Sequence, residues 1–71
     1  MEQVTINWLF KSALVDAFGS QIDAARQLKI NHSLISLMVR GRRMPHDHER
    51  QKLERALGKK ITQRCFPEIY Q

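Results

Sequence analysis

Cysteine, glycine, proline and long hydrophobic runs are all scarce in this chain. Of its 71 residues, one is cysteine, three are glycine and two are proline. The single cysteine, Cys65, excludes an internal disulfide and is typical of a packing residue. No apolar run approaches the roughly 18 residues of a membrane span, and the N-terminus lacks a signal-peptide pattern. We therefore expect a soluble, cytosolic protein.

Motifs that carry catalysis or bind metal are also missing from the sequence. It has no glycine-rich phosphate loop and no paired carboxylate motif, and no histidine stands in an evident catalytic pairing with Cys65. His46 and His48 are two residues apart near an expected helix start, so they point about 200° apart and cannot chelate one ion together. No cysteine or carboxylate cluster completes a zinc-ligand set. We expect no enzyme activity, no metal and no cofactor.

Acidic residues are absent from residues 24–43. The net charge of the whole chain is +5, and this segment alone carries +5, whereas residues 1–23 carry −2, residues 44–60 carry +2 and residues 61–71 balance. A basic stripe of this kind is typical of a protein that binds a polyanion, here nucleic acid. The alternative, a solvated basic surface, does not explain why the acids avoid the segment. Its five bases are Arg26, Lys29, Arg40, Arg42 and Arg43.

The apolar periodicity predicts helices and no strand. We expect a first helix over about residues 7–18, with an apolar face of Ile6, Leu9, Phe10, Ala13, Leu14, Ala17 and Phe18. Gly19 ends it, and Ser20 with Asp23 forms a capping box for the second helix. That helix turns Ile22, Ala25 and Leu28 inward.

The later helices are marked by caps and breakers. Lys29 and Ile30 form a turn, and Asn31 caps a third helix that Gly41 ends. A fourth helix runs from Pro45 to Leu57 and ends at Gly58. Beyond it, we expect one helical turn at residues 62–65. The chain is thus predicted to be a small all-α domain without repeats or linkers.

The third helix has two faces of different chemistry. At 100° per residue, five side chains fall within an arc of about 140°. Leu34, Ile35, Met38 and Val39 occupy the other side and predict a buried face. A helix with short hydrogen-bonding side chains on its outer face suits the major groove of DNA. The outer residues are His32, Ser33, Ser36, Leu37 and Arg40.

Residues 21–41 resemble the helix-turn-helix of the Cro and repressor (XRE-like) family of phage and bacterial regulators. With the flanking helices, the likeness covers about residues 7–58. The chain also looks like small prophage Cro-type and YdaS-like antitoxin-type regulators, through residues 54–56 (Glu-Arg-Ala) and the tail residues 61–62 and 67–69. The matching helix-turn-helix positions are Gln21, Ala25, Leu28, Ile30, Ile35, Met38 and Gly41.

This resemblance implies a lambda-repressor-like fold of four to five helices, with residues 1–71 as one helix-turn-helix domain, a core at 7–58 and a tail at 59–71. It places His32, Ser33, Ser36 and Leu37 at base edges; Leu37 either contacts a thymine methyl or is an ordinary exposed leucine. The DNA backbone would be held by Gln21, Asn31, Arg40, Arg42 and Arg43.

Lys29 is the one departure from the family pattern, because the turn position is usually glycine. A residue other than glycine at positive φ costs on the order of 1 kcal/mol. Either Lys29 tolerates that strain or the turn has a different shape.

Two apolar clusters have no certain place in the core. Trp8 and Val15 lie nearly opposite the core face of the first helix, and Val4 joins them if that helix begins early. The tail offers Phe66, Ile69 and Tyr70. Either cluster could form a dimer interface, and the tail is slightly favoured. Alternatively, the tail folds back and covers Trp8 with Ile69 and Tyr70.

The sequence as a whole predicts a sequence-specific transcriptional regulator, a Cro-like repressor that binds operator DNA as a homodimer. One recognition helix contacts too few base pairs to select a site in a genome, and pairing doubles the number contacted. The alternative is an antitoxin or anti-repressor whose helix surface binds an acidic protein partner. The two differ in whether affinity depends on base sequence.

Overall fold

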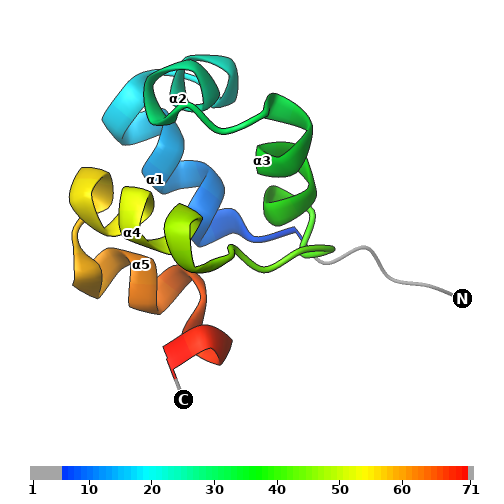
Figure 1. The fold of residues 1–71 in the computed structure, drawn as a ribbon. Coiled ribbons are helices and arrows are strands. Elements are labelled where there is room, and N and C mark those ends of the chain that lie inside the picture. The colour runs from blue at the N-terminus through cyan, green and yellow to red at the C-terminus, as the bar shows by residue number, and fades with distance from the viewer. Residues whose placement is uncertain (1–5, 71) are drawn as a thin grey trace, which may run out of the picture.

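Residues 6–70 of the chain fold into five helices and a final 3-10 turn (Figure 1). The computed structural model describes residues 6–70, and within that range it contains no strand. No helix in the described part is long and apolar enough to cross a membrane. The all-α prediction is therefore confirmed. The elements are α1 (Trp8–Phe18), α2 (Gln21–Leu28), α3 (His32–Val39), α4 (Asp47–Leu57), α5 (Lys59–Cys65) and η1 (Pro67–Tyr70).

Local capping sets the boundaries of the first two helices. The Asn7 side chain accepts a hydrogen bond from the Phe10 N–H at 3.1 Å, so α1 begins one residue after the expected start. Gly19 follows α1 at φ +93°, a backbone conformation that favours glycine. The Ser20 hydroxyl accepts from the Asp23 N–H and donates to the Asp23 carboxylate, both at 3.0 Å. The predicted break at residues 19–20 is confirmed.

One apolar core joins all five helices. It takes two side chains from α1, three each from α2 and α3, and single contributions from the turn, α4, α5 and the residue that follows α5. The apolar face predicted for the third helix is confirmed, because its inner residues are buried or half-buried. The buried residues are Phe10, Leu14, Ala24, Ala25, Leu28, Ile30, Ile35, Met38, Val39, Leu53, Cys65 and Phe66.

Three residues expected in the core are exposed instead. Leu9 and Ala17 lie at the edges of the α1 apolar face, and only the Phe10–Leu14 stripe at its centre is fully covered. Ile22 is 60% exposed because α2 buries Ala24, Ala25 and Leu28, and Ile22 lies about 100° around the helix from that stripe. The inward orientation predicted for Ile22 was wrong.

The fourth and fifth helices differ from the expected boundaries. Helix α4 begins at Asp47 rather than at Pro45, which is buried ahead of the His46 N-cap. Helix α5 has seven residues rather than one turn, and the buried Thr62 hydroxyl donates to the Gly58 carbonyl at 2.9 Å. The buried core continues past residue 58 into this helix.

Phe66 closes the core from the C-terminal side. It is 1% exposed and its ring meets Phe10 edge to face, with ring centroids 4.8 Å apart. The expectation that Phe66 contributes to a dimer interface was therefore wrong, since a buried side chain is not available to a partner.

The last residues are tied back to the domain. Ile69 packs against the core, and the Tyr70 hydroxyl donates to the Glu54 carboxylate, which also receives the Arg50 guanidinium at 3.1 Å. Trp8 stays 61% exposed, so the tail does not cover it. Val4 lies outside the described residues.

Candidate nucleic-acid interface

Helices α2 and α3 are joined by three residues with a defined backbone. Lys29 adopts φ +58° and ψ +41°, the left-handed conformation normally occupied by glycine. The Ile30 N–H donates to the Ala25 carbonyl at 3.1 Å, and the Lys52 ammonium donates to the Lys29 carbonyl at 3.2 Å. Of the two alternatives for Lys29, the first is correct: Lys29 tolerates the strained left-handed conformation, and these hydrogen bonds stabilise it.

Helix α3 is fixed at its start and along its inner face. The Asn31 side-chain oxygen accepts from the Ser33 N–H at 2.8 Å, which confirms Asn31 as the cap. Ile35 and Met38 are fully buried and Val39 nearly so. The Asn7 N–H also donates to the Val39 carbonyl at 2.7 Å, which ties the end of α3 to the start of α1. These contacts determine which side of α3 faces outward.

The outward side of α3 brings together the residues predicted to contact bases. One shallow hollow of about 340 Å3 is lined by five side chains of this helix and its C-terminal cap. The two serines and the histidine supply short hydrogen-bonding groups there. Leu37 is 36% exposed at the same hollow, which leaves both interpretations of this residue open. The lining residues are His32, Ser33, Ser36, Leu37 and Arg40.

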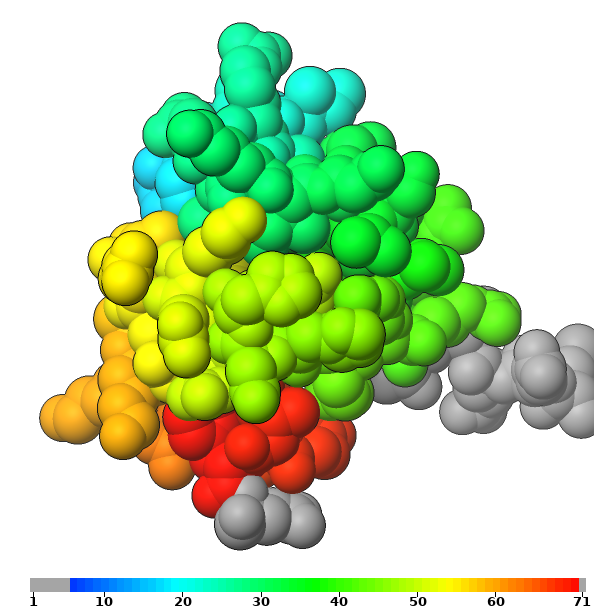
Figure 2. All heavy atoms as spheres, viewed as in Figure 1, coloured from blue at the N-terminus to red at the C-terminus, as the bar shows by residue number. Residues whose placement is uncertain are grey.

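Exposed basic residues flank this hollow along the chain. Arg40 and Arg42 are exposed where α3 ends, and Lys29 is exposed at the turn before it. Arg26 is also exposed but pairs with Asp23 at 3.2 Å, so part of its charge is compensated. In Figure 2 the cyan to blue-green atoms of α2 and the green atoms of α3 form the upper part of the visible face, above the yellow-green start of α4.

The two remaining residues predicted to contact the DNA backbone differ in exposure and in their free hydrogen-bonding groups. Gln21 is half-buried at the first position of α2. Asn31 is exposed, and its side-chain oxygen is used by the cap. Because the cap uses the oxygen, the side-chain NH2 group of Asn31 is the part that can donate a hydrogen bond to a ligand.

Arg43 does not belong to the exposed basic group. Its guanidinium lies 2.6 Å from the Glu49 carboxylate, and the two side chains are only 18% and 3% exposed. The same carboxylate oxygen accepts from the His46 N–H at 2.8 Å. The prediction that Arg43 holds the DNA backbone was therefore wrong: Arg43 neutralises a buried carboxylate.

Glu49 is the structural residue that the sequence analysis missed. Burial by itself raises the pKa of Glu49, but the hydrogen bond from Arg43, the N–H of His46 and the nearby positive charges outweigh it, so the pKa is lowered. A glutamate three residues after an N-cap is a recognised capping position, and that spacing from His46 was the available signal.

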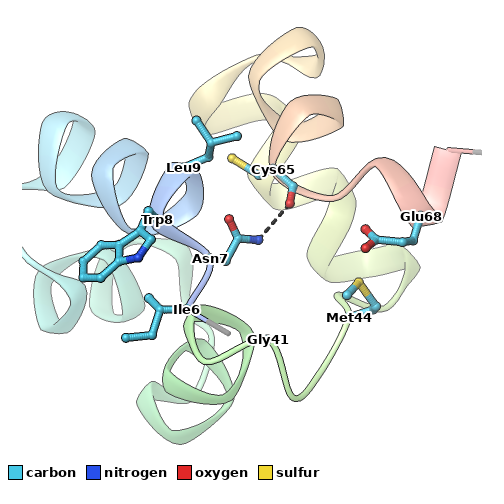
Figure 3. Close-up of a pocket in the computed structure, with 8 residues that line it drawn as sticks. All are labelled: Ile6, Asn7, Trp8, Leu9, Gly41, Met44, Cys65 and Glu68. Carbon is cyan, nitrogen blue, oxygen red and sulfur yellow. Dashed lines mark hydrogen bonds between the residues drawn. The ribbon is translucent and has the colours of Figure 1, made fainter. Parts of the chain in front are cut away.

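A second hollow, of about 500 Å3, lies between the start of α1 and the C-terminal turn (Figure 3). The Asn7 amide at its centre donates to the Cys65 carbonyl at 2.8 Å. Burial raises the pKa of the Cys65 thiol, against a smaller opposite effect of Arg64, and a raised pKa is the reverse of what a thiolate nucleophile needs. Among residues 6–70, no three histidine, cysteine or acidic side chains gather as a metal site.

No family model matches the chain, and neither the curated proteins nor the solved structures contain a match to it.

Proposed function

We propose that the chain is a sequence-specific DNA-binding regulator of the Cro and repressor type, with a lambda-repressor-like fold in which α2 and α3 form the helix-turn-helix. It acts as a homodimer that represses by occupying operator DNA, in the cytoplasm of a bacterial host cell. The observation that carries the proposal is the hollow on α3, because its polar side chains face outward from a helix whose other face is locked in the core.

The chemistry of this helix suits the major groove. Each base pair presents a distinct set of donors, acceptors and, for thymine, a methyl group there. Serine hydroxyls donate and accept, and a histidine ring does the same when neutral. Ser33 and Ser36 are thus assigned to base edges together with His32, and Leu37 to an apolar contact with a thymine methyl.

Backbone contacts come from groups at the ends of the two helices. Arg40 and Arg42 are exposed where α3 ends and attract phosphates without regard to sequence. Gln21 begins α2, where an amide side chain and a helix N-terminus together suit a phosphate oxygen.

Replacing Ser33 or Ser36 by alanine is expected to change sequence preference and leave folding intact, because neither side chain is buried. Each well-made contact is worth about 1–3 kcal/mol of discrimination against the wrong base. The measurement is the affinity of each variant for a preferred duplex and for its single-base variants. Gln51→Ala, at an exposed position of α4, is the control and should keep the parent's preferences. If the alanine variants at His32, Ser33 and Ser36 all keep the parent's preference at every position, α3 does not select the sequence.

Replacing Arg42 by alanine is expected to weaken binding to all sequences equally. When one phosphate contact is lost, fewer counterions are released on binding. The negative slope of log K against log salt should therefore become shallower by roughly 0.9. Titrations of the parent and the variant at several salt concentrations, on preferred and random duplexes, measure this slope. Lys60→Ala, far along the chain on α5, should leave it unchanged. A variant that loses only specific binding at constant slope would contradict the assignment of Arg42 to the backbone.

A further inference from the structure

Exposed apolar side chains gather on one face of the molecule. Six large apolar residues are exposed in residues 6–70, and four of them belong to α1 and α5. Ile22 and Leu37, the other two, lie on α2 and α3. We name the four residues the α1–α5 face: Trp8, Leu9, Val15 and Ile61.

The two helices meet in a way that makes this face continuous. Leu9 and Ile61 line one hollow of about 220 Å3 between α1 and α5, and Leu9 also lines the larger hollow beside Trp8 (Figure 3). Val15 lies seven residues after Trp8 and so on the same side of α1. Ser12 lies between them, and its small side chain allows another helix to approach closely.

Charges of both signs border the same hollow. Asp16 of α1 and Arg64 of α5 line it together with Leu9 and Ile61, and both are exposed. Neither forms an ion pair within the described part of the chain. A contact between identical copies about a two-fold axis must be complementary to itself, so charges within it can pair only if both signs are present on one patch.

We propose that the α1–α5 face is where a second copy of this chain docks. The apolar side chains of the two copies pack against each other, and Asp16 of each copy faces Arg64 of the other. A copy of the same chain is favoured over another partner because the patch carries its own complementary charges. Helix α1 carries one base, Lys11, and one acid, Asp16, so this side of the contact adds no net charge between two basic copies.

The location is compatible with two recognition helices on one DNA molecule. Within the described residues, α5 makes no contact with α3, and the hollow between α1 and α5 shares no residue with the one on α3. Seen from the side of α3 and α4, α1 is almost wholly hidden (Figure 2). The chain measures 36 × 27 × 19 Å, so two touching copies can place equivalent helices on the order of 34 Å apart, one DNA turn. The inference rests on the homodimer of the proposed function and identifies the surface through which the two copies would contact each other.

Sedimentation equilibrium of the full chain without DNA tests the proposal. The parent is expected to dimerise, and Leu9→Lys or Ile61→Lys should weaken the dimer by about tenfold or more, because each buries a charge among apolar groups. Ile22→Lys, at an exposed isoleucine outside the face, is the control and should leave the dimer unchanged.

A charge exchange gives a test that folding defects cannot imitate. Asp16→Arg or Arg64→Asp alone should weaken the dimer about tenfold, because like charges then face each other. The double variant should recover the parent's dimerisation. A parent chain that stays monomeric at about 1 mM, or a dimer that is indifferent to Leu9→Lys and to both single exchanges, would overturn the proposal. A parent that dimerises through this face but binds no DNA would refute the proposed function and leave this inference standing.

Discussion

Replacing Arg43 by alanine is expected to destabilise the folded chain by about 3 kcal/mol, whereas the same change at Arg42 should cost no more than about 0.5 kcal/mol. Arg43→Ala leaves the 3% exposed Glu49 carboxylate without its counter-charge, and an unpaired buried charge is costly. We take the lower end of the usual range because Arg43 itself reaches solvent. Arg42 is exposed, so its removal leaves no buried group unpaired. Urea unfolding of the two variants side by side measures the difference.

The same ion pair predicts how stability depends on pH. Because the pKa of Glu49 is lowered in the folded state, its contribution is fully present above the ordinary glutamate pKa of about 4.3 and is lost as the pH falls through the lower, folded-state value. Glu49→Gln keeps an oxygen for the His46 N–H but carries no charge, so this variant should be less stable than the parent near pH 7 and lose less stability on acidification. Equal stability of Arg42→Ala and Arg43→Ala, or parallel pH profiles of parent and Glu49→Gln, would show that the pair does not hold α4 in place.

Replacing Phe66 by alanine is expected to cost about 3–5 kcal/mol, which is a large share of the stability of so small a domain. The ring is almost fully buried against Phe10, so truncation removes the edge-to-face contact and leaves a cavity between α1 and α5. Thermal and urea unfolding measure the loss. Removing residues 61–71 altogether should unfold the chain, so such a truncation tests folding rather than dimerisation.

Ile22→Ala is the control for the Phe66 variant. Its side chain is 60% exposed, so the change should stay within about 0.5 kcal/mol. A Phe66→Ala variant that is as stable as Ile22→Ala would mean that the C-terminal segment packs loosely and that the core ends before residue 66.

The boundaries of the first three helices and the end of α4 were predictable because they depend on neighbouring residues. Asn7, Ser20 and Asn31 cap helices through backbone groups two or three positions away, and Gly19 and Gly58 end them with positive φ. The two faces of α3 were predictable for a similar reason, since eight residues contain a full set of inner and outer positions.

The different roles of the three neighbouring arginines were not predictable from the sequence. Arg40, Arg42 and Arg43 form one basic run after α3, and only the position of Glu49, six residues after Arg43 in α4, separates Arg43 from the others. The tail posed the same difficulty: Phe66 is one apolar residue among several, and its burial depends on Phe10, which is 56 positions earlier. Such long-range pairings leave no local pattern in the sequence.

Selection of bound duplexes from random DNA, with the full chain in solution, tests the proposed function most directly. We predict enrichment of a short motif, repeated as two half-sites about one helical turn apart when two copies bind. Enrichment should be lost when His32, Ser33 and Ser36 are all replaced by alanine in a chain that remains folded. Recovery of unenriched random DNA by the folded parent chain would contradict the proposal and favour instead a protein partner for the surface of α3.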